Sequence, residues 1–238
     1  MARKSTRRFY TSATIEPSGD VYAVLLDGRA AKTPAGAALA VPHQALARAI
    51  AAEWEGAGDP IDLDELPLTR LAATAIDLGA RDRDRWAEEI LNYLKSDLIC
   101  YRAQEPQALI MRQEVIWSPY REWAKQALGA DLPLASGLVA VEQPAEALAG
   151  ARKRVSSMDD WSLLGLRTAS GIAGSAVLGF ALEARAFRPR DIFAASRLDE
   201  RFQAERWGAD DEATAREARL EREFMTVARW FELLAEKR

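Results

Sequence analysis

The densest group of residues able to do acid–base chemistry lies near the end of the chain, in the stretch LDERFQAERWGADDEA (198–213). Six carboxylic acids surround two aromatic residues there: Asp199, Glu200, Glu205, Asp210, Asp211 and Glu212 around Phe202 and Trp207. Two carboxylates can serve as general acid and base when burial raises the pKa of one of them. On an ideal helix, however, Glu200 and Glu205 diverge by about 140°. A catalytic pair would therefore need a second carboxylate from elsewhere.

Helical geometry divides this stretch into two faces, at 100° per residue. Leu198 and Phe202 share an apolar stripe that we expect to face the core, and Asp199 sits between the two faces. The other stripe has spacings of 3, 4, 3 and 4 residues and carries Phe193, Ser196, Glu200, Gln203 and Trp207. Aromatic anchors around polar groups are typical of protein interfaces. The stripe therefore favours a recognition surface or a structural network over catalysis.

Composition excludes several other kinds of site. The chain has 238 residues and a formal net charge of −4, which argues against broad electrostatic binding of nucleic acid. One cysteine and one histidine rule out a disulfide within the chain and a Cys/His zinc site. The glycines show neither Walker nor dinucleotide-binding spacing, so we expect no cofactor. The most apolar run, 168–182, has 15 residues where a membrane span needs roughly 20, which predicts a buried helix and no membrane insertion.

The elements that must position the acidic stretch fall into two parts. Alternating apolar residues and an Asp27–Gly28 turn predict a β-hairpin or meander in the first forty residues. A helix follows from Pro42 to Gly56, with Trp54 on its apolar face. The rest is mostly helical, apart from a predicted loop at 131–144 with room for a short strand. The sequence thus predicts an α+β fold: a small β-rich N-terminal domain with one helix (1–65) and a larger α-helical bundle domain (66–238).

Within the helical part, several boundaries follow from glycine and proline. Gly79 is expected to stop one helix before another begins, and Pro119 to kink or split a third. One helix is predicted from Pro189 to Gly208, carrying most of the acidic stretch. Asp210, Asp211 and Glu212 are then expected to begin the last helix, where acids suit the positive end of the helix dipole.

Eight motifs, taken in order, resemble a known family. They are RFY (8–10), LLDGRAAKTP (25–34), AAEW (51–54), PLTRLAATAID (67–77), SDLICYRA (96–103), RQEVIWSP (112–119), GSAVLGFAL (174–182) and the acidic stretch itself. Together they resemble the ATP synthase assembly chaperone family that acts on the alpha subunit of the catalytic sector, and they cover nearly the whole chain. The family occurs in mitochondria and in alphaproteobacteria.

The resemblance implies a chaperone and not an enzyme. It implies binding of the unassembled alpha subunit, shielding of its beta-subunit-facing surface, and prevention of aggregation until the hexamer forms. It also implies importance for an acidic residue matching Glu200 and for the tryptophan Trp54, whose alternative role is a core anchor. Asp97, Tyr101 and Arg102 either form a structural network or line the binding groove. We expect a monomer in the bacterial cytoplasm, with eukaryotic relatives in the mitochondrial matrix.

Two rival interpretations remain open. One is a membrane-peripheral protein that uses the run 168–182, which predicts that this run is exposed. The other is an enzyme. Glu200 acting with another carboxylate or with Arg102 could make the protein a hydrolase or a lyase. That interpretation predicts a deep pocket with convergent polar groups, whereas a chaperone predicts a broad, shallow surface.

Overall fold

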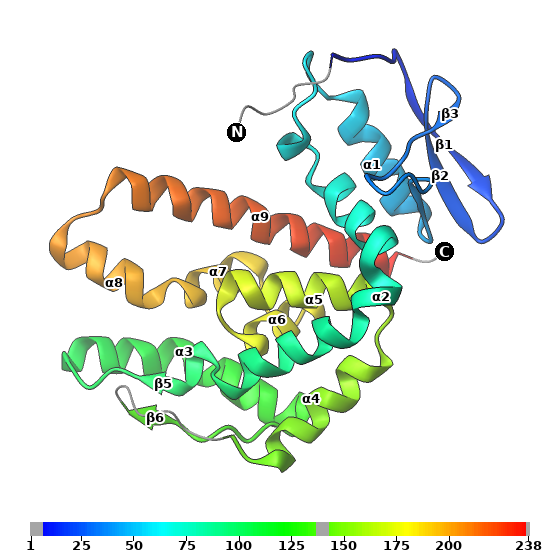
Figure 1. The fold of residues 1–238 in the computed structure, drawn as a ribbon. Helices are drawn as coiled ribbons and strands as arrows, with labels where there is room; N and C mark the ends of the chain where they lie inside the picture. Colours follow the sequence, from blue (N-terminus) through cyan, green and yellow to red (C-terminus); the bar gives the residue numbers. More distant parts are fainter. Residues whose placement is uncertain (1–6, 137–142, 237–238) are drawn as a thin grey trace. The chain divides into compact units, whose positions relative to one another are not determined.

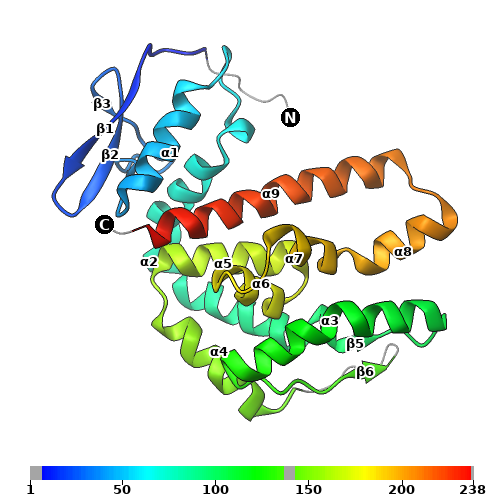
Figure 2. The same cartoon turned by 180° about the vertical axis from the view of Figure 1, so that it is seen from behind.

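The computed structural model describes residues 7–136 and 143–236, which form a small antiparallel sheet followed by a mostly helical region (Figures 1 and 2). The predicted α+β class is confirmed. The N-terminal strands are β1 (Ala13–Ser18), β2 (Val21–Leu26), β3 (Arg29–Ala30) and β4 (Ala40–Val41). A second, parallel pair joins β5 (Tyr101–Arg102) to β6 (Ala135–Ser136). Residues 137–142 lie outside the described residues.

Helices make up most of the chain. They are α1 (Gln44–Glu55), α2 (Pro67–Lys95), α3 (Gln107–Leu128), α4 (Ala145–Ser157), α5 (Asp160–Ala173), α6 (Ala176–Glu183), α7 (Pro189–Ser196), α8 (Leu198–Trp207) and α9 (Asp211–Ala235), with short 3₁₀ turns η1 (Leu63–Glu65) and η2 (Leu98–Cys100). The contacts divide the chain into two compact units, Met1–Arg83 with Arg229–Arg238, and Asp84–Ala228. The division falls inside α2 and α9, whereas the sequence predicted one domain boundary, between residues 65 and 66.

The sheet of the first unit is built on β2. It pairs with β1 along its whole length and with β3 and β4 on its other side. The expected hairpin turn is present, because Asp27 and Gly28 both adopt positive φ, at 48° and 76°. Helix α1 packs against the strands, and its Leu46, Ile50 and Trp54 are buried as the periodicity predicted.

The predicted helix end at Gly79 is wrong, and Pro119 does not split its helix. Helix α2 continues through Gly79, which is buried, because a single glycine costs a helix only about 1 kcal/mol relative to alanine. Helix α3 spans Pro119 as one helix, so the helix is not split there, and a kink at Pro119 stays a prediction. The two continuous helices show that one unfavourable residue did not outweigh the favourable residues on either side.

The apolar run 168–182 is mostly buried, as predicted, but it is not one helix. Gly174 ends α5 in the left-handed conformation (φ 65°), and the Ser175 side chain caps α6 by accepting from the Leu178 N–H at 3.0 Å. The two helices then pack closely at Gly179. A Cβ there would lie 2.4 Å from the Ser170 Oγ. The small residues therefore form a tight helical hairpin and not a stripe on one helix.

A second unexpected break falls between α7 and α8, where the sequence predicted continuity. The Ser196 hydroxyl donates to the Phe193 carbonyl at 2.7 Å, and Arg197 leaves the helical conformation with φ −109° and ψ 15°. A serine hydroxyl that bonds to the backbone of the preceding turn competes with helix continuation. The break matters because it rotates α8 relative to the stripe expected from a single helix.

Candidate partner-binding surface

Helix α8 lies between α3 and α9 in the second unit (Figures 1 and 2). Its Leu198 and Phe202 are buried, as the apolar stripe predicted. Just before it, the Trp117 indole N–H donates to the Ala195 carbonyl at 2.9 Å. This bond fixes the end of α7 on α3. The start of α8 is therefore set by the core.

Asp199 belongs to a polar link between α8 and α3. It accepts at Oδ1 from the Gln113 side-chain amide at 2.8 Å, and the Gln113 carbonyl oxygen accepts from the Ala103 N–H, also at 2.8 Å. Gln113 is only 2% exposed, so both halves of its amide are satisfied inside the protein. Burial raises the pKa of the Asp199 carboxyl above its ordinary value. Asp199 therefore holds α8 in place.

Ion pairs fix the edges of α8. Glu205 accepts from Arg112 of α3 at 2.7 Å, and Arg201 bonds Glu217 of α9 at 2.7 Å. The Arg112 guanidinium also lies 5.1 Å from the centre of the Phe202 ring. Contacts of this kind keep the partly exposed rim of the helix ordered. The other side of α8 is thereby held outward.

The outward side carries Glu200, Gln203 and Trp207, all exposed. Trp207 is 84% exposed, more than any other large apolar side chain among the described residues. Glu200 makes an ion pair with Arg197 at 3.3 Å, and its side chain is still 59% exposed. We call these three residues the α8 stripe. It is a shallow mixed surface in which an aromatic side chain lies next to polar ones.

Phe193 does not belong to the α8 stripe, so this expectation is wrong. It is 1% exposed and packs on Phe224 of α9, with ring centres 5.7 Å apart. The break at Arg197 separates it from α8, and the Arg197 side chain covers its ring, with 6.0 Å from the guanidinium to the ring centre. Phe193 is a core residue here because the helix does not continue with the assumed 100° rotation per residue.

Asp97 lies in a structural network. It is fully buried, and its carboxylate accepts from the Val177 N–H at 3.0 Å and the Ile99 N–H at 3.3 Å, with further bonds from Ser175 and Ala176. These donors lie at the start of α6, where free N–H groups and the helix dipole favour a negative charge. Even so, burial raises the pKa of Asp97 to about 6.

Arg102 is held by a neighbouring carboxylate. It donates to Glu114 of α3 at 2.6 Å, and Arg121 bonds the same carboxylate at 3.1 Å. Arg121 also donates to the Ile99 carbonyl at 3.3 Å. Arg102 thus lies in a network around η2 and α3 and is not directed toward Glu200 by any of these contacts.

Trp54 lies in the first unit, in the core between α1 and the strands. It is buried and packs edge-on against Tyr10, with ring centres 5.7 Å apart. The Tyr10 hydroxyl donates to the Trp54 carbonyl at 2.6 Å. This environment suits the core-anchor role that the sequence left open for Trp54.

The sequence reasoning missed an apolar row on α3. Met111 and Val115 are one turn apart and are 60% and 73% exposed, and the neighbouring Ala108 and Pro119 are exposed as well. The signal was present in LIMRQEVIW, which has more apolar residues than one helix face can bury. Exposed apolar rows of this kind mark interaction surfaces more often than scattered single residues do.

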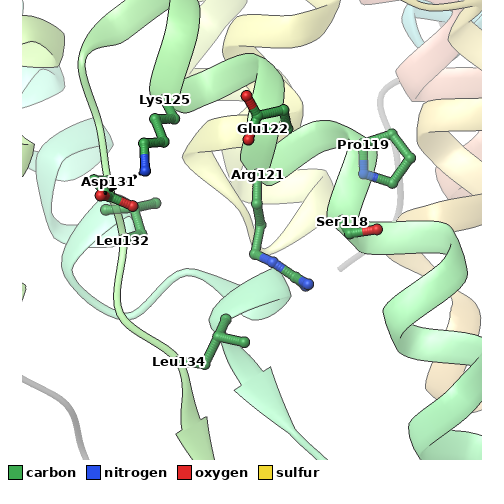
Figure 3. A pocket seen from close by; sticks show the side chains of 8 residues that line it. All are labelled: Ser118, Pro119, Arg121, Glu122, Lys125, Asp131, Leu132 and Leu134. Carbon is green, nitrogen blue, oxygen red and sulfur yellow. Dashed lines mark ion pairs between the residues drawn. The ribbon is translucent and has the colours of Figure 1, made fainter.

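A hollow lies between the second half of α3 and the segment leading to β6 (Figure 3). Its wall includes Arg121, Leu132 and Leu134, and the Lys125–Asp131 ion pair at 2.9 Å closes one side. Glu200 does not line it. The hollow therefore does not bring Glu200 together with the second carboxylate that the rival interpretation needs.

The described part of the chain has neither a membrane-spanning helix nor a cluster of metal-ligating side chains. Within residues 7–136 and 143–236, no helix combines the length and the apolar character needed to cross a bilayer. In the same residues, no three His, Cys, Asp or Glu side chains are grouped as metal ligands would be.

Comparisons with known proteins give a consistent picture. The model of the ATP12 chaperone protein family matches residues 7–125. The chain is similar to mitochondrial Atp12 of Schizosaccharomyces pombe, with 26% identity over 226 residues, 90% of this chain and 77% of that protein.

Solved structures agree over the whole fold. The crystal structure of Atp12 from Paracoccus denitrificans superposes with a TM-score of 0.92 at 37% identity, covering 97% of this chain and 99% of that one. A structure of a protein from Agrobacterium tumefaciens gives a TM-score of 0.92 at 34% identity, covering 96% and 86%. On this evidence of sequence and structure, the chain belongs to the ATP12 chaperone family.

Proposed function

We propose that the protein binds the unassembled alpha subunit of the ATP synthase catalytic sector and shields its beta-subunit-facing surface until the hexamer forms. The α8 stripe is the proposed contact. The observation that carries this assignment is the exposure of Trp207 beside Glu200 and Gln203 on a helix whose other sides are fixed by the core. We further propose that the protein acts as a monomer without catalysis, in the bacterial cytoplasm.

Trp207 is the proposed anchor. Tryptophan is enriched among the few interface residues that carry most of the binding energy, because it buries a large area at a low cost in rotamer entropy. On α8 it contributes little to the fold, since most of its surface is in water. An exposed side chain of this size is available to cover an apolar patch on a client that would otherwise aggregate.

Glu200 is the proposed polar contact, pairing with an arginine of the client. Its present ion pair with Arg197 is of the exposed kind, which stabilises a protein by about 1 kcal/mol or less. Exchange of Arg197 for a client guanidinium therefore costs little. A mixed polar and aromatic contact also suits a chaperone that must release the alpha subunit to the beta subunit.

The hydrolase or lyase alternative has less support. A general acid needs a carboxyl group that burial keeps protonated near neutral pH. Glu200 is more than half exposed and lies on an open helix face. A membrane role for the run 168–182 is also disfavoured, because residues 176–182 are buried in α6.

The test uses charge and size changes on the α8 stripe. Glu200→Lys and Trp207→Ala are expected to weaken binding to isolated alpha subunit by about tenfold or more. They are also expected to abolish the protein's suppression of alpha-subunit aggregation, measured by light scattering. Glu200→Gln should have a smaller effect, because it keeps the shape of the side chain.

Glu223→Lys is the matched control, since Glu223 is an exposed acid on α9 away from the stripe. Circular dichroism must show native folding for every variant. If the wild-type protein does not bind isolated alpha subunit, the proposed function is wrong. If it binds and the α8 variants bind equally well, the function stands and the site assignment is wrong.

A further inference from the structure

Strand β1 is an edge of the N-terminal sheet. It pairs with β2 on one side, and no other described strand pairs with it. In its antiparallel ladder, Ser12 accepts from the Asp27 N–H at 3.0 Å, so this pair is a hydrogen-bonded one. Backbone groups alternate in direction along a strand, which points those of Ala13, Ile15 and Pro17 away from β2. The Ala13 N–H agrees with this pattern, because it donates to Glu55 at 2.8 Å.

A groove runs beside this edge, between β1 and α1. Its apolar wall is formed by Ile15 of the strand and by Ala51 and Ala52 of the helix. Ala13 and Ile15 face α1, because their cross-strand partners Leu26 and Val24 are buried on that side. The small alanines leave room for one side chain of an added segment.

The two ends of the groove carry opposite charges. Glu55 is fixed at the Ala13 end by its bond to the Ala13 N–H, and Arg48 lines the same groove two helical turns earlier, about 10 Å along α1. The Arg48 side chain makes no hydrogen bond or ion pair with another described residue, and Arg48 is exposed. The groove thus has an acidic end, an apolar middle and a basic end.

The strand edge is open only in its middle. Pro17 has no N–H to donate, and Glu55 already occupies the Ala13 N–H. Prolines and charged side chains at edge strands prevent uncontrolled pairing of sheets. The remaining outward groups are the Ile15 N–H and C=O and the C=O groups of Ala13 and Pro17. These groups suit one short extended segment and not a long strand.

We propose that this β1–α1 groove binds an extended segment of the client by strand addition. The segment bonds to the Ile15 backbone, inserts one apolar side chain against Ala52, and places a basic residue at Glu55 and an acidic residue at Arg48. Backbone bonds give affinity and the pocket gives selectivity in this mode of recognition. Naming the alpha subunit as the source of the segment rests on the proposed function, whereas the groove chemistry does not.

A second copy of this chain fits the edge poorly. Antiparallel pairing of two β1 strands about Ile15 places Pro17 opposite Ala13. In each of these pairs Pro17 has no N–H to donate, and the Ala13 N–H is already bonded to Glu55. Only the two bonds between the Ile15 residues would form. The charge pattern of the groove instead matches a foreign segment with its own basic and acidic residues.

Two matched pairs of variants test the groove. Ala52→Leu fills the apolar middle, and Ala80→Leu makes the same change at an exposed position of α2. Arg48→Glu reverses the charge at the basic end of the groove, and Arg29→Glu makes the same charge change on exposed β3, outside the groove. One probe is the isolated alpha subunit. The other is a pair of seven-residue peptides, each with a central valine, a lysine two residues to one side and a glutamate two residues to the other side. The two peptides carry the lysine and the glutamate in opposite orders.

We expect either probe to slow hydrogen exchange of the Ile15 amide. Ala52→Leu and Arg48→Glu should weaken binding by about fivefold or more, while both controls bind like wild type and all four variants keep their melting temperature. If the wild type fails to bind alpha subunit but protects Ile15 with a patterned peptide, the proposed function is wrong and the groove is retained. If neither probe protects Ile15, or the groove variants bind as well as their controls, the groove assignment is wrong.

Discussion

The α5–α6 hairpin is mostly apolar and helix α8 is mostly polar. Each region has one side chain that does not fit its surroundings, and the two cases have different explanations. The hairpin is the most apolar part of the chain, and its exceptional contact is the buried carboxylate of Asp97 at the start of α6. Helix α8 is highly charged, and its exceptional residue is the exposed Trp207. Asp97 is surrounded by donors, whereas Trp207 has almost no neighbours to cover it.

The difference separates structural residues from functional ones. A buried charge persists only where hydrogen bonds compensate for lost hydration, so Asp97 is explained by the fold. An exposed tryptophan receives little stabilisation from the fold, so its presence needs another explanation, and binding supplies one. The following changes test this distinction.

The largest expected effect is that of Asp97→Ala. The change leaves the Val177 and Ile99 N–H groups without their acceptor inside the protein, which should lower the free energy of unfolding by about 3 to 5 kcal/mol. Urea denaturation followed by circular dichroism measures it, with Asp20→Ala in an exposed turn as the control. A loss below about 1 kcal/mol would contradict the structural role of Asp97.

The pH dependence of Asp97 is the next test. Its pKa is raised from 3.8 to about 6 in the folded state, so the folded protein binds this proton more tightly than the unfolded chain does. The stability that protonation adds is therefore complete below about pH 4 and is lost as the pH rises through 6.

Asp97→Asn removes this titration. The stability of the wild type relative to that of Asp97→Asn should therefore fall by up to roughly 3 kcal/mol between pH 4 and pH 7. Urea denaturation at a series of pH values measures the difference, with Asp20→Asn as the control. A difference that stays constant with pH would show that Asp97 titrates normally.

The smallest expected effect on stability is that of Trp207→Ala. Because the side chain is almost entirely in water, the free energy of unfolding should change by less than about 0.5 kcal/mol. Thermal and urea unfolding check this outcome. A loss above 2 kcal/mol would mean that Trp207 packs in the fold, and the contrast with Asp97 would then disappear.

Local patterns predicted a large part of the molecule. The Asp27–Gly28 hairpin, the buried face of α1, the acidic start of α9 and the apolar stripe of Leu198 and Phe202 all follow from residue spacing and turn chemistry. These features depend on neighbours within one or two turns of the chain. Such neighbours are visible in the sequence itself.

The candidate site was predicted only in part. Glu200, Gln203 and Trp207 do share an exposed face, because they lie within a single helix and their spacing alone decides the geometry. Phe193 was wrongly predicted to share this face, because the Ser196 hydroxyl bond and the non-helical backbone of Arg197 end the helix between Phe193 and Glu200. The exposed row of Met111 and Val115 was missed because helical periodicity shows that a residue is apolar, not whether another element covers it.

The sequence by itself determined the fold class, the family and the residue types available for binding, since these depend on composition, order and local spacing. The tertiary structure decided which of those residues face water. The packing of α8 between α3 and α9 leaves Trp207 exposed, and the packing of α7 on α9 buries Phe193. The position of Asp97 against the start of α6 lets its carboxylate accept from the Val177 N–H. Burial depends on contacts between segments distant in the chain, and no local pattern records those contacts.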